Sequence, residues 1–419
     1  MDSLEKSGQK ITAALLVSQS LFSASVIMLF TISSIIAVQL ADNNSQWTGV
    51  PSTLIMVGAA SVAYPIGRLM DKKGRRAGLS VGHIFGISGA VIAGLAVINE
   101  SLLIFLLGVF CIGLAKGVID LGRYAAAEAN IVSRRARAIS LVVLGGTVGS
   151  VSGPALIKWT GVLAERFDAP GLSGPWFAAA LFLILSLVII NLFLRPDPQL
   201  IARQLAALEP GPAMPNQKGR TFQEVLFGEQ RAKLAVAAMV FGQLTMVLVM
   251  TITPVHMHDH HHEIGAISWV IMAHTLGMFG LSFLVGWLVD RLGRTRMIML
   301  GSLILIGACL IAPLSTEVFW LIIALFLLGL GWNCCFVAGS TLLADVLRPH
   351  EKGQVQGLAD AVVNIASGVG SLGGGLVFAA IGYTAMNWIG IVVAVVPVLL
   401  VIFLRSARSQ MPLEGTVSS

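Results

Sequence analysis

Three charged side chains recur at helical spacing inside one long apolar stretch of the sequence, residues 102–127. Lys116, Asp120 and Arg123 occupy positions i, i+4 and i+7, which lie on one face of a helix. If this helix enters a membrane near Leu102, Lys116 lies about 21 Å along it, near the midplane. Ionisable groups at that depth are costly and usually serve binding or proton transfer. We therefore predict a substrate and proton site on this face; the alternative is a self-neutralising ladder that only holds the helix in place.

If this site exchanges a substrate for protons, Asp120 is the expected proton carrier. An Asp120 carboxyl that takes up a proton loses its charge and frees Lys116, one helical turn away. Substrate and proton would then compete, which is the minimum requirement for exchange transport. The hypothesis assigns proton transfer to Asp120 and substrate binding to Lys116.

A histidine-rich stretch, residues 254–263, is a second candidate site. It holds five of the eight histidines. If a helix continues through it, His256 with His260, and His258 with His262, form i, i+4 pairs that can chelate a transition metal. Alternatively, the histidines could sense external pH. The simplest interpretation is a solvated loop whose composition is incidental.

The composition places these residues in a membrane protein. The chain is 56% hydrophobic and 11% charged, with a mean hydropathy of +0.86, whereas soluble proteins are about 25% charged. Apolar runs of about 20 residues recur, each long enough to cross a bilayer. All four cysteines lie in these runs, which indicates buried thiols rather than disulfides. We predict twelve spans, at residues 11–40, 49–70, 77–98, 102–127, 138–163, 175–195, 232–256, 264–289, 297–314, 318–346, 354–380 and 386–405.

The net charge of +6 reflects the loops between these runs. Nearly all lysines and arginines lie in alternate loops, and the positive-inside rule then places both termini in the cytoplasm. We expect an integral protein of a bacterial inner (plasma) membrane, with the lipid bilayer as its surroundings and a monomeric state. The basic residues are dispersed and lack an aromatic stacking platform, so no nucleic-acid partner is expected.

A short motif joins the second and third apolar runs and returns in the second half of the chain. Residues 67–75 and 286–294 both read Gly-x-x-x-Asp-[Lys/Arg]-x-Gly-Arg, at a constant offset of 219, which indicates an internal duplication. Gly67 has no Cβ and permits close helix approach. Asp71 can meet the positive N-terminal end of another helix, and Gly74 can form a tight turn. A solvated charged loop would explain one copy, but not two at a common offset.

This paired motif resembles the loops between helices 2 and 3 and between helices 8 and 9 of the major facilitator superfamily of secondary transporters. The resemblance covers the whole chain. It implies an all-α membrane protein with twelve transmembrane helices in two pseudo-symmetric six-helix bundles. The chain then divides into a bundle at 1–195, a cytoplasmic linker at 196–231, and a second bundle with a short tail at 232–419. Within the linker, 200–208 can form an amphipathic helix on the membrane surface.

The resemblance also implies which residues form the cytoplasmic gate. In the family, acidic residues that end helices 4 and 10 pair with the arginines of the motif, and Asp71 pairs with the start of helix 11. Here Glu128 and Asp345, 217 positions apart, stand at the ends of those helices; ordinary solvated charge is the alternative. The implied gating residues are Gly67, Asp71, Gly74, Arg75, Glu128, Gly286, Asp290, Arg294 and Asp345.

Helix 5 resembles the motif that marks proton-coupled exporters in this superfamily. Gly149 and Gly153 are four positions apart, which permits close helix packing, and Pro154 frees a backbone carbonyl. The sequence departs from the motif at Ile157 and Lys158, where glycines are expected. The arginine of the helix 4 motif is also missing: the stretch reads Gly-Leu-Ala-Lys-Gly at 113–117. The helix 5 resemblance nevertheless favours antiport.

The family's central cavity is lined by helices 1, 4, 7 and 10, which supplies further candidates. Lys116 aligns with Asn333 at an offset of 217, so the two are expected to face each other in the cavity. Weaker candidates, more often packing residues than ligands, are Gln19, Gln243, Tyr64 and His274.

The prediction is a secondary transporter that works by alternating access, without a cofactor, and exports a small organic compound in exchange for protons. Two alternatives are proton-coupled uptake of an anionic metabolite held by Lys116 and Arg123, and export of a divalent metal or metal chelate through the histidines. A non-transporting membrane sensor on the same fold is a third.

Overall fold

The computed structural model describes residues 2–42, 47, 50–208, 220–262, 264–348 and 351–409, and all regular structure in these residues is helical. The first half contains α1 (Asp2–Leu40), α2 (Val50–Lys73), α3 (Arg75–Ile98), α4 (Leu102–Ile119), α5 (Gly122–Glu128), the 3₁₀ turn η2 (Val132–Arg134), α6 (Arg135–Glu165), the 3₁₀ turn η3 (Gly171–Ser173) and α7 (Gly174–Phe193).

Two short helices, α8 (Pro198–Leu208) and α9 (Phe222–Gly228), lead to the second half. That half contains α10 (Gln230–Asp259), α11 (Ile264–Thr275), the π-helical turn η4 (Leu276–Gly280), α12 (Ser282–Leu292), α13 (Arg294–Ile311), α14 (Val318–Val346) and α15 (Lys352–Ser409). The backbone of Gly382, with φ 81°, divides α15 into two helices.

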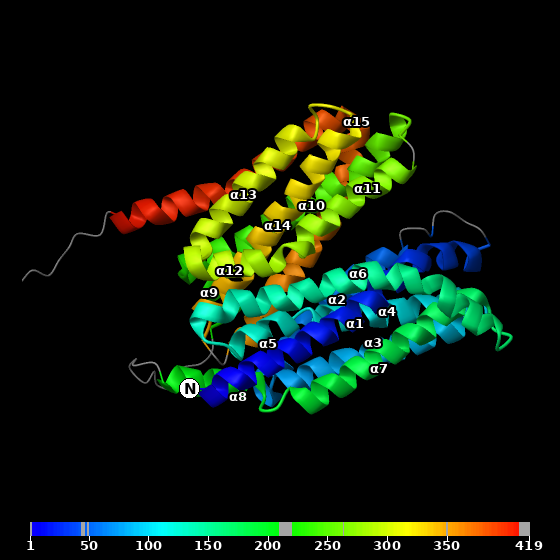
Figure 1. The fold of residues 1–419 in the computed structure, drawn as a ribbon, viewed down its shortest axis with the longest axis horizontal. Coiled ribbons are helices and arrows are strands. Elements are labelled where there is room, and N and C mark those ends of the chain that lie inside the picture. The colour runs from blue at the N-terminus through cyan, green and yellow to red at the C-terminus, as the bar shows by residue number, and fades with distance from the viewer. Residues whose placement is uncertain are drawn as a thin grey trace, which may run out of the picture.

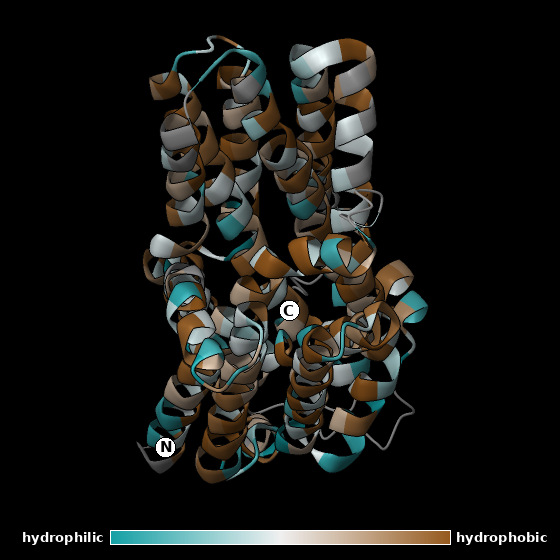
Figure 2. Ribbon diagram, turned by 90° about the vertical axis from the view of Figure 1, so that its right-hand side faces the viewer, coloured by the Kyte–Doolittle hydropathy of each residue, from teal (hydrophilic) through white to brown (hydrophobic). Residues whose placement is uncertain are grey.

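The helices account for twelve membrane crossings. Nine helices in the described part of the chain are long and apolar enough to cross a membrane, and the bent pair α11–α12 makes a tenth. The other two are α6 and the first part of α15, which are long but richer in glycine and serine. Hydrophobic residues, in brown, recur along the helices in Figure 2, and large side chains such as Leu103 remain exposed, as contact with lipid requires.

The two halves form separate bundles that meet at one end of the molecule (Figure 1). Helices α1 to α7, blue to green, form one bundle, and α10 to α15, green to red, form the other. They converge where α5, α9 and α12 lie and diverge toward the other end. The turns at Gly74 and Gly293 lie at the converging end, which we call the motif end; the α10–α11 turn lies at the opposite end.

The motif turns are shorter than the sequence predicts. Helix α2 continues to Lys73 and α3 begins at Arg75, so Gly74 alone forms the turn. Its φ of 91° lies in the left-handed region that favours glycine, and Gly293 repeats it with a φ of 93° between α12 and α13. The tight turn predicted from these glycines is confirmed.

Two of the crossings are interrupted. The fourth has a tight turn at Asp120 and Leu121, where the Leu121 N–H bonds the carbonyl of Val118, three residues back. The eighth is bent by 42° at its break, and its π-helical turn η4 carries residues 276–280. π-helical turns are rare and often occur at functional sites.

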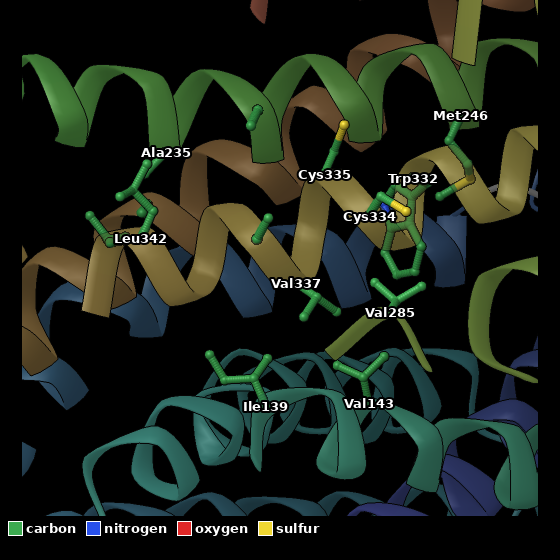
Figure 3. Packing of buried hydrophobic residues seen from close by; sticks show 14 of the residues in the cluster. Ile139, Val143, Ala235, Met246, Val285, Trp332, Cys334, Cys335, Val337 and Leu342 are labelled. Atoms are coloured by element: carbon green, nitrogen blue, oxygen red, sulfur yellow. The ribbon is translucent and has the colours of Figure 1, made fainter. Parts of the chain in front are cut away.

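The halves pack on each other through apolar side chains. In Figure 3, Ile139 and Val143 of α6 point toward α14, and Val337 of α14 lies between the two helices. All three side chains are buried in one continuous hydrophobic cluster. The helices that line the interface are therefore held by contacts that form only when the halves approach.

Part of the predicted linker, including the expected helix at 200–208, packs on the first bundle. Both carboxylate oxygens of Asp197 accept hydrogen bonds from the backbone N–H groups of Arg75 and Arg76 at the start of α3. Ile201 of α8 is fully buried, so α8 uses its apolar side for contacts with protein. Linker residues 209–219 lie outside the described residues.

Candidate functional site

Each motif aspartate binds the start of a helix from the other half. The Asp71 carboxylate accepts hydrogen bonds from the backbone N–H groups of Gly353 (2.9 Å) and Gln354 (3.1 Å), at the start of α15. Asp290 does the same with Ala136 (3.2 Å) and Arg137 (3.0 Å) of α6. Helix N-termini carry free N–H groups and a partial positive charge, which a carboxylate satisfies. The predicted contact of Asp71 with the start of helix 11 is therefore present, and the second motif copy repeats it.

Glycines bring the helices close enough for these bonds. A Cβ on Gly67 would lie 2.5 Å from the carbonyl oxygen of Gly353, and one on Gly286 would lie 2.9 Å from that of Ala136. Real Cβ atoms do not approach so closely, so both positions require glycine. The first residue of each motif copy thus permits the contact that the aspartate makes.

The motif arginines have the acidic partners that the resemblance implies. Arg75 is buried and donates two hydrogen bonds of 2.8 Å to the Glu128 carboxylate. In the second half, Arg294 Nε lies 3.0 Å from Asp345, whose other oxygen accepts a 2.7 Å bond from Arg135. Since Arg135 belongs to the first half, Asp345 joins the two halves at the motif end.

A cavity of about 290 Å³ lies between the halves. Its walls come from eight elements, and most of the lining residues are apolar: α1, α4, α5, α6, α10, η4, α14 and α15. Its polar lining residues are Gln19, Ser23, Lys116, Asp120, Arg123, Gln243, Asp360, Asn364 and Ser367. A mostly apolar cavity with a few convergent polar groups is the usual form of a small-molecule site.

The three predicted charges of the fourth crossing all line this cavity. Lys116 Nζ lies 2.5 Å from Asp120 Oδ2, and the two side chains are 32% and 25% exposed. Arg123 lies deeper, with a 5% exposed side chain. The tight turn at Asp120 does not move these side chains off the cavity face, so their common orientation is confirmed.

Arg123 is held by partners from both halves. Its Nη1 donates to the Asp120 carbonyl (2.7 Å), and its Nε donates to the Ser340 hydroxyl of α14 (3.2 Å). Its Nη2 donates to Tyr124 (3.1 Å) and to the carboxylate of Asp360 on α15, with which it forms an ion pair. Asp360 was not predicted from the sequence.

The signal for Asp360 was nevertheless present. Asp360, Asn364 and Ser367 stand at i, i+4 and i+7 in the apolar run 354–380, the same spacing as the three charges of the fourth crossing. All three line the cavity. An aspartate inside a membrane span is by default a functional candidate, and this one faces the predicted arginine.

An aromatic wall on the second half was also missed. Trp332 and Phe336 of α14 are stacked with ring centroids 4.8 Å apart, and Phe279 of η4 meets Trp332 edge-on at 5.9 Å. The Trp332 indole N–H donates to Gln243 (2.6 Å), whose amide donates to Ser367 (2.7 Å). Aromatic residues in an apolar run do not reveal whether they face lipid or a cavity, so the sequence carried no such signal.

Of the four weaker polar candidates, Gln19 and Gln243 line the cavity, and His274 and Tyr64 do not; nor does Asn333, the expected partner of Lys116. Asn333 is buried and donates to Ser282 (3.0 Å), away from Lys116. His274 is buried against the carbonyl of Leu325. Tyr64 lies outside the lining, with the guanidinium of Arg68 4.6 Å from its ring. The expectation that Asn333 faces Lys116 in the cavity is therefore wrong, and Tyr64 and His274 are packing residues here.

The error for Asn333 is one of register. A Cβ on Gly113 would meet the carbonyl of Ile55, and a Cβ on Gly329 would meet that of His274. Ile55 and His274 are 219 positions apart, as the motif copies are, but the two glycines are only 216 apart. Around Gly113 and Gly329, equivalent residues of α4 and α14 are therefore 216 positions apart in the sequence.

With that offset, the counterpart of Lys116 is Trp332, which does line the cavity. One position along a helix is a rotation of about 100°, which turns Asn333 away. Nearer the motif end the offset is 217, where Arg123 bonds Ser340 directly. The tight turn at Asp120 lies between these levels, and its greater rise per residue accounts for the difference of one residue.

The glycines of helix 5 form a packing seam. A Cβ on Gly153 would lie 2.6 Å from the carbonyl of Ala24, and Gly149 is equally close to Ser23 and Ala24 on α1. The close packing predicted for these glycines is present. The side chain of Pro154 lies outside the described residues.

The histidine stretch does not form a metal centre in the described part of the chain. No three potential ligands are grouped there. His256 stacks on Tyr383 with ring centroids 4.0 Å apart, and the Nδ1 of His260 bonds the His256 carbonyl. His262 bonds the carbonyl of Thr316. The side chain of His258 lies outside the described residues.

The chain crosses the membrane twelve times in two related halves. A cavity lies between the halves, and charged residues of each half bind the other. This is the architecture of a membrane transporter. The family profile described as Major Facilitator Superfamily matches residues 15–242 and 234–417. The chain belongs to the major facilitator superfamily and is an integral membrane secondary transporter.

Relatives cover nearly the whole chain. The uncharacterized MFS-type transporter YdeG of Bacillus subtilis (strain 168) is 33% identical over 377 residues, which are 90% of this chain and 87% of that protein. The riboflavin transporter RfnT of Brucella anthropi is 29% identical over 398 residues, 93% of this chain and 95% of that protein. Among solved structures, the human organic anion transporter MFSD10 (TETRAN) has a TM-score of 0.75 at 15% identity, covering 94% and 99% of the two chains, which is a likeness of fold.

Proposed function

We propose that this transporter exports a flat aromatic heterocycle, with riboflavin as the lead compound, in exchange for protons. The observation that carries the proposal is the cavity wall, where stacked aromatic rings lie beside side-chain amides and a partly exposed ion pair. Rings recognise flat aromatic ligands by stacking, and the amides Gln19 and Gln243 suit the carbonyl and N–H groups of a heterocycle. The similarity to RfnT supports the same class of compound.

The position of the Lys116–Asp120 pair supports a role in substrate binding. Both side chains reach the cavity and are partly exposed, so a ligand can exchange hydrogen bonds with them. The aromatic wall stands on the other half of the molecule. A bound heterocycle would therefore touch both halves, which is what a transporter needs if its substrate is to influence the rocking of one half against the other.

Exchange with protons is supported by the carboxylates in the cavity and by the helix 5 seam. Asp120 and Asp360 both line the cavity, where a proton can reach them. Gly149 and Gly153 have the close packing on α1 that the exporter-like motif requires. The basic loops further support an orientation with the motif end and both termini in the cytoplasm of a bacterial cell. In that orientation the contacts at the motif end close the cytoplasmic side.

Two alternatives fit the cavity less well. A metabolite anion would need unpaired positive charge, but Lys116 and Arg123 are already paired with Asp120 and Asp360. A transported metal would need ligands in the cavity, and the described histidines of the 254–263 stretch do not line it.

Transport into proteoliposomes tests the proposal. Riboflavin movement, followed by fluorescence, should be opposite in direction to the proton flow that an imposed pH gradient drives. It should stop when an ionophore collapses that gradient. Ribitol, which shares the sugar-alcohol chain of riboflavin but lacks the ring system, is the matched control and should not move. Equal flux of both compounds, or riboflavin flux that ignores the pH gradient, would rule the proposal out.

A further inference from the structure

The Arg123–Asp360 ion pair connects the two halves inside the membrane. Arg123 belongs to α5 of the first half and Asp360 to α15 of the second. Their side chains are 5% and 9% exposed, so water screens the pair little. The pair lines the floor of the cavity, on the side of the motif end. Any movement that separates the halves at the motif end must break it.

The Lys116–Asp120 pair has no such connection with the movement. Both residues lie one turn apart on the same crossing, so their distance does not depend on which side of the membrane the cavity faces. Protonation of Asp120 would change the charge of the cavity without releasing one half from the other. The two acidic residues are therefore suited to different tasks.

The second oxygen of Asp360 has the properties of a proton-binding site. Its Oδ1 accepts the hydrogen bonds from Arg123 and Tyr124, while its Oδ2 is buried and has no hydrogen-bond partner among the described residues. A buried oxygen without a donor is a costly place for negative charge, and a bound proton removes that cost. Since Asp360 lines the cavity, a proton can arrive from the side to which the cavity opens.

We propose that Asp360 is the carboxyl group that couples proton movement to alternation between the two conformations. A proton from the outer solution binds Asp360, the carboxylate becomes a neutral acid, and the ion pair with Arg123 is discharged. The halves can then separate at the motif end, and the same proton leaves to the cytoplasm, which restores the carboxylate. This inference rests on the proton coupling of the proposed function and names the residue that performs it.

The groups around Asp360 are consistent with this role. The charged or titratable ones are Arg123, Tyr124, Asp120 and Lys116, all from the fourth crossing. Helices α10 and α14 present the neutral Met239 and Ser340 beside Tyr124 and Arg123. On α2, Gly67 and Ala63 face α15 at Gly353 and Gly357, and Asp71 lies at the N-terminus of α15.

Arg123 keeps partners after the release. Its bonds to the Asp120 carbonyl and to Tyr124 lie within the first half and do not depend on Asp360. Its guanidinium also lies 4.3 Å from the ring centroid of Tyr124, in the same half, and such a ring attracts a cation. The released arginine can therefore remain in place while the halves separate.

The test compares Asp360→Asn, the charge-free pair Arg123→Gln with Asp360→Asn, and Asp120→Asn. Asp168→Asn, in the exposed turn before α7, is the matched control. The charge-free pair guards against failure of the single variant to fold, because it leaves no unpaired buried arginine. The first measurement needs no substrate: hydrogen exchange, at one common pD, of the backbone amides of residues 353–354 and 136–137 at the motif end.

We expect these amides to exchange about tenfold faster in the charge-free pair than in the wild type, because the motif end opens more often. The measurement is then repeated at lower pD, and each rate is corrected for the intrinsic pD dependence of amide exchange. The corrected rate should rise in the wild type and in Asp168→Asn, but not in the charge-free pair. In proteoliposomes the charge-free pair should lose pH-driven accumulation of riboflavin and retain downhill flux. Asp120→Asn should bind riboflavin more weakly but, at saturating substrate, still accumulate it in response to the pH gradient.

Two results would overturn the inference: unchanged hydrogen exchange in the charge-free pair, or pH-driven accumulation that survives in it and disappears in Asp120→Asn. The proposed substrate fails separately. If the wild type moves no riboflavin but shows the expected acid-dependent exchange at the motif end, the substrate is wrong and the role of Asp360 stands.

Discussion

Two buried arginines, Arg75 and Arg123, each pair with a carboxylate on another helix. Arg75 bonds Glu128 twice and also lies 3.2 Å from Asp71. A buried ion pair is expensive when one partner is removed, by about 3–5 kcal/mol, because the other charge is left alone. Conformational change at these sites must therefore exchange partners or protons instead of leaving charges unpaired.

Substitution of Asp71 tests whether the charge contacts at the motif end are needed for transport. Asp71→Asn should fold and insert into the membrane but transport at a small fraction of the wild-type rate. The uncharged amide interacts less well with the start of α15 and with Arg75, which weakens the closed motif end by about 1–2 kcal/mol. Flux in proteoliposomes, normalised to inserted protein, measures the effect.

The second motif copy supplies the comparison for this prediction. Asp290→Asn should impair transport less, because Arg294 lies 3.5 Å from Asp290 and the copy is degenerate at Thr295. Wild-type flux in Asp71→Asn would remove the gating role from this residue.

At the scale of helices and turns, a contact outside the membrane ties the end of the linker to the start of α15. The carboxylate of Glu351 accepts hydrogen bonds from the side chain of Arg220 (2.6 Å) and from its backbone N–H (2.9 Å). Burial opposes the charge of Glu351, but the hydrogen bonds from Arg220 outweigh it and hold the pKa of this carboxyl below its usual 4.5. The linker is thereby fixed next to the helix that Asp71 caps.

This contact predicts a pH-dependent stability. A carboxyl whose pKa is lower in the folded state stabilises it above the unfolded pKa, and loses that contribution as the pH falls through the folded pKa. Glu351→Gln should lower the unfolding temperature by about 1–3 °C near neutral pH. The difference from the wild type should shrink below about pH 4.5, the usual value for glutamate. Scanning calorimetry over this range would contradict the assignment if the difference stayed constant.

The histidine stretch yields a further prediction at this scale. The described rings of His256, His260 and His262 are engaged in stacking and in bonds to backbone carbonyls, so we expect no zinc or nickel binding at micromolar concentration. Isothermal titration calorimetry on the wild type measures it directly. A variant with His256, His258, His260 and His262 replaced by alanine is the control. If the wild type binds zinc or nickel with a micromolar dissociation constant and this variant does not, the metal hypothesis is restored.

The same elements mark where sequence reasoning succeeds and fails. Glycines with a steric task, such as Gly67 and Gly74, could be assigned from the sequence because few other residues fit close helix contacts or a positive φ. The register of Asn333 could not, because it depends on a tight turn at Asp120 in the other half. A tight turn inside a helix leaves little trace in the amino-acid composition. It nevertheless changes the direction in which the following side chains point around the helix axis.

For the whole molecule, the duplication has a mechanical consequence. Asp71 of the first half caps α15 of the second, and Asp290 of the second half caps α6 of the first, so the motif end is closed by two related contacts. The sequence predicted the paired motif and the twelve crossings. It did not predict the site that joins the halves in the membrane, because Asp360 has no acidic counterpart: at an offset of 217 the equivalent position is Val143.

That asymmetry leads to a last prediction, which separates binding from coupling. Lys116→Met combined with Asp120→Leu removes both charges of the ladder and leaves the Arg123–Asp360 pair intact. We expect this variant to fold, because neutral replacement of an ion pair is often tolerated. It should bind riboflavin about tenfold more weakly, which corresponds to the loss of about 1.4 kcal/mol of polar contacts.

The pH dependence of transport is the deciding measurement for this variant. If Asp360 carries the coupled proton, the rate at saturating substrate should depend on pH as it does in the wild type, since the ladder lies within one half and does not open or close the molecule. Lys116→Ala alone should weaken binding in the same way. A ladder variant with normal affinity and normal pH dependence would show that the pair only holds the fourth crossing in place. Loss of the pH dependence would return the coupling role to Asp120.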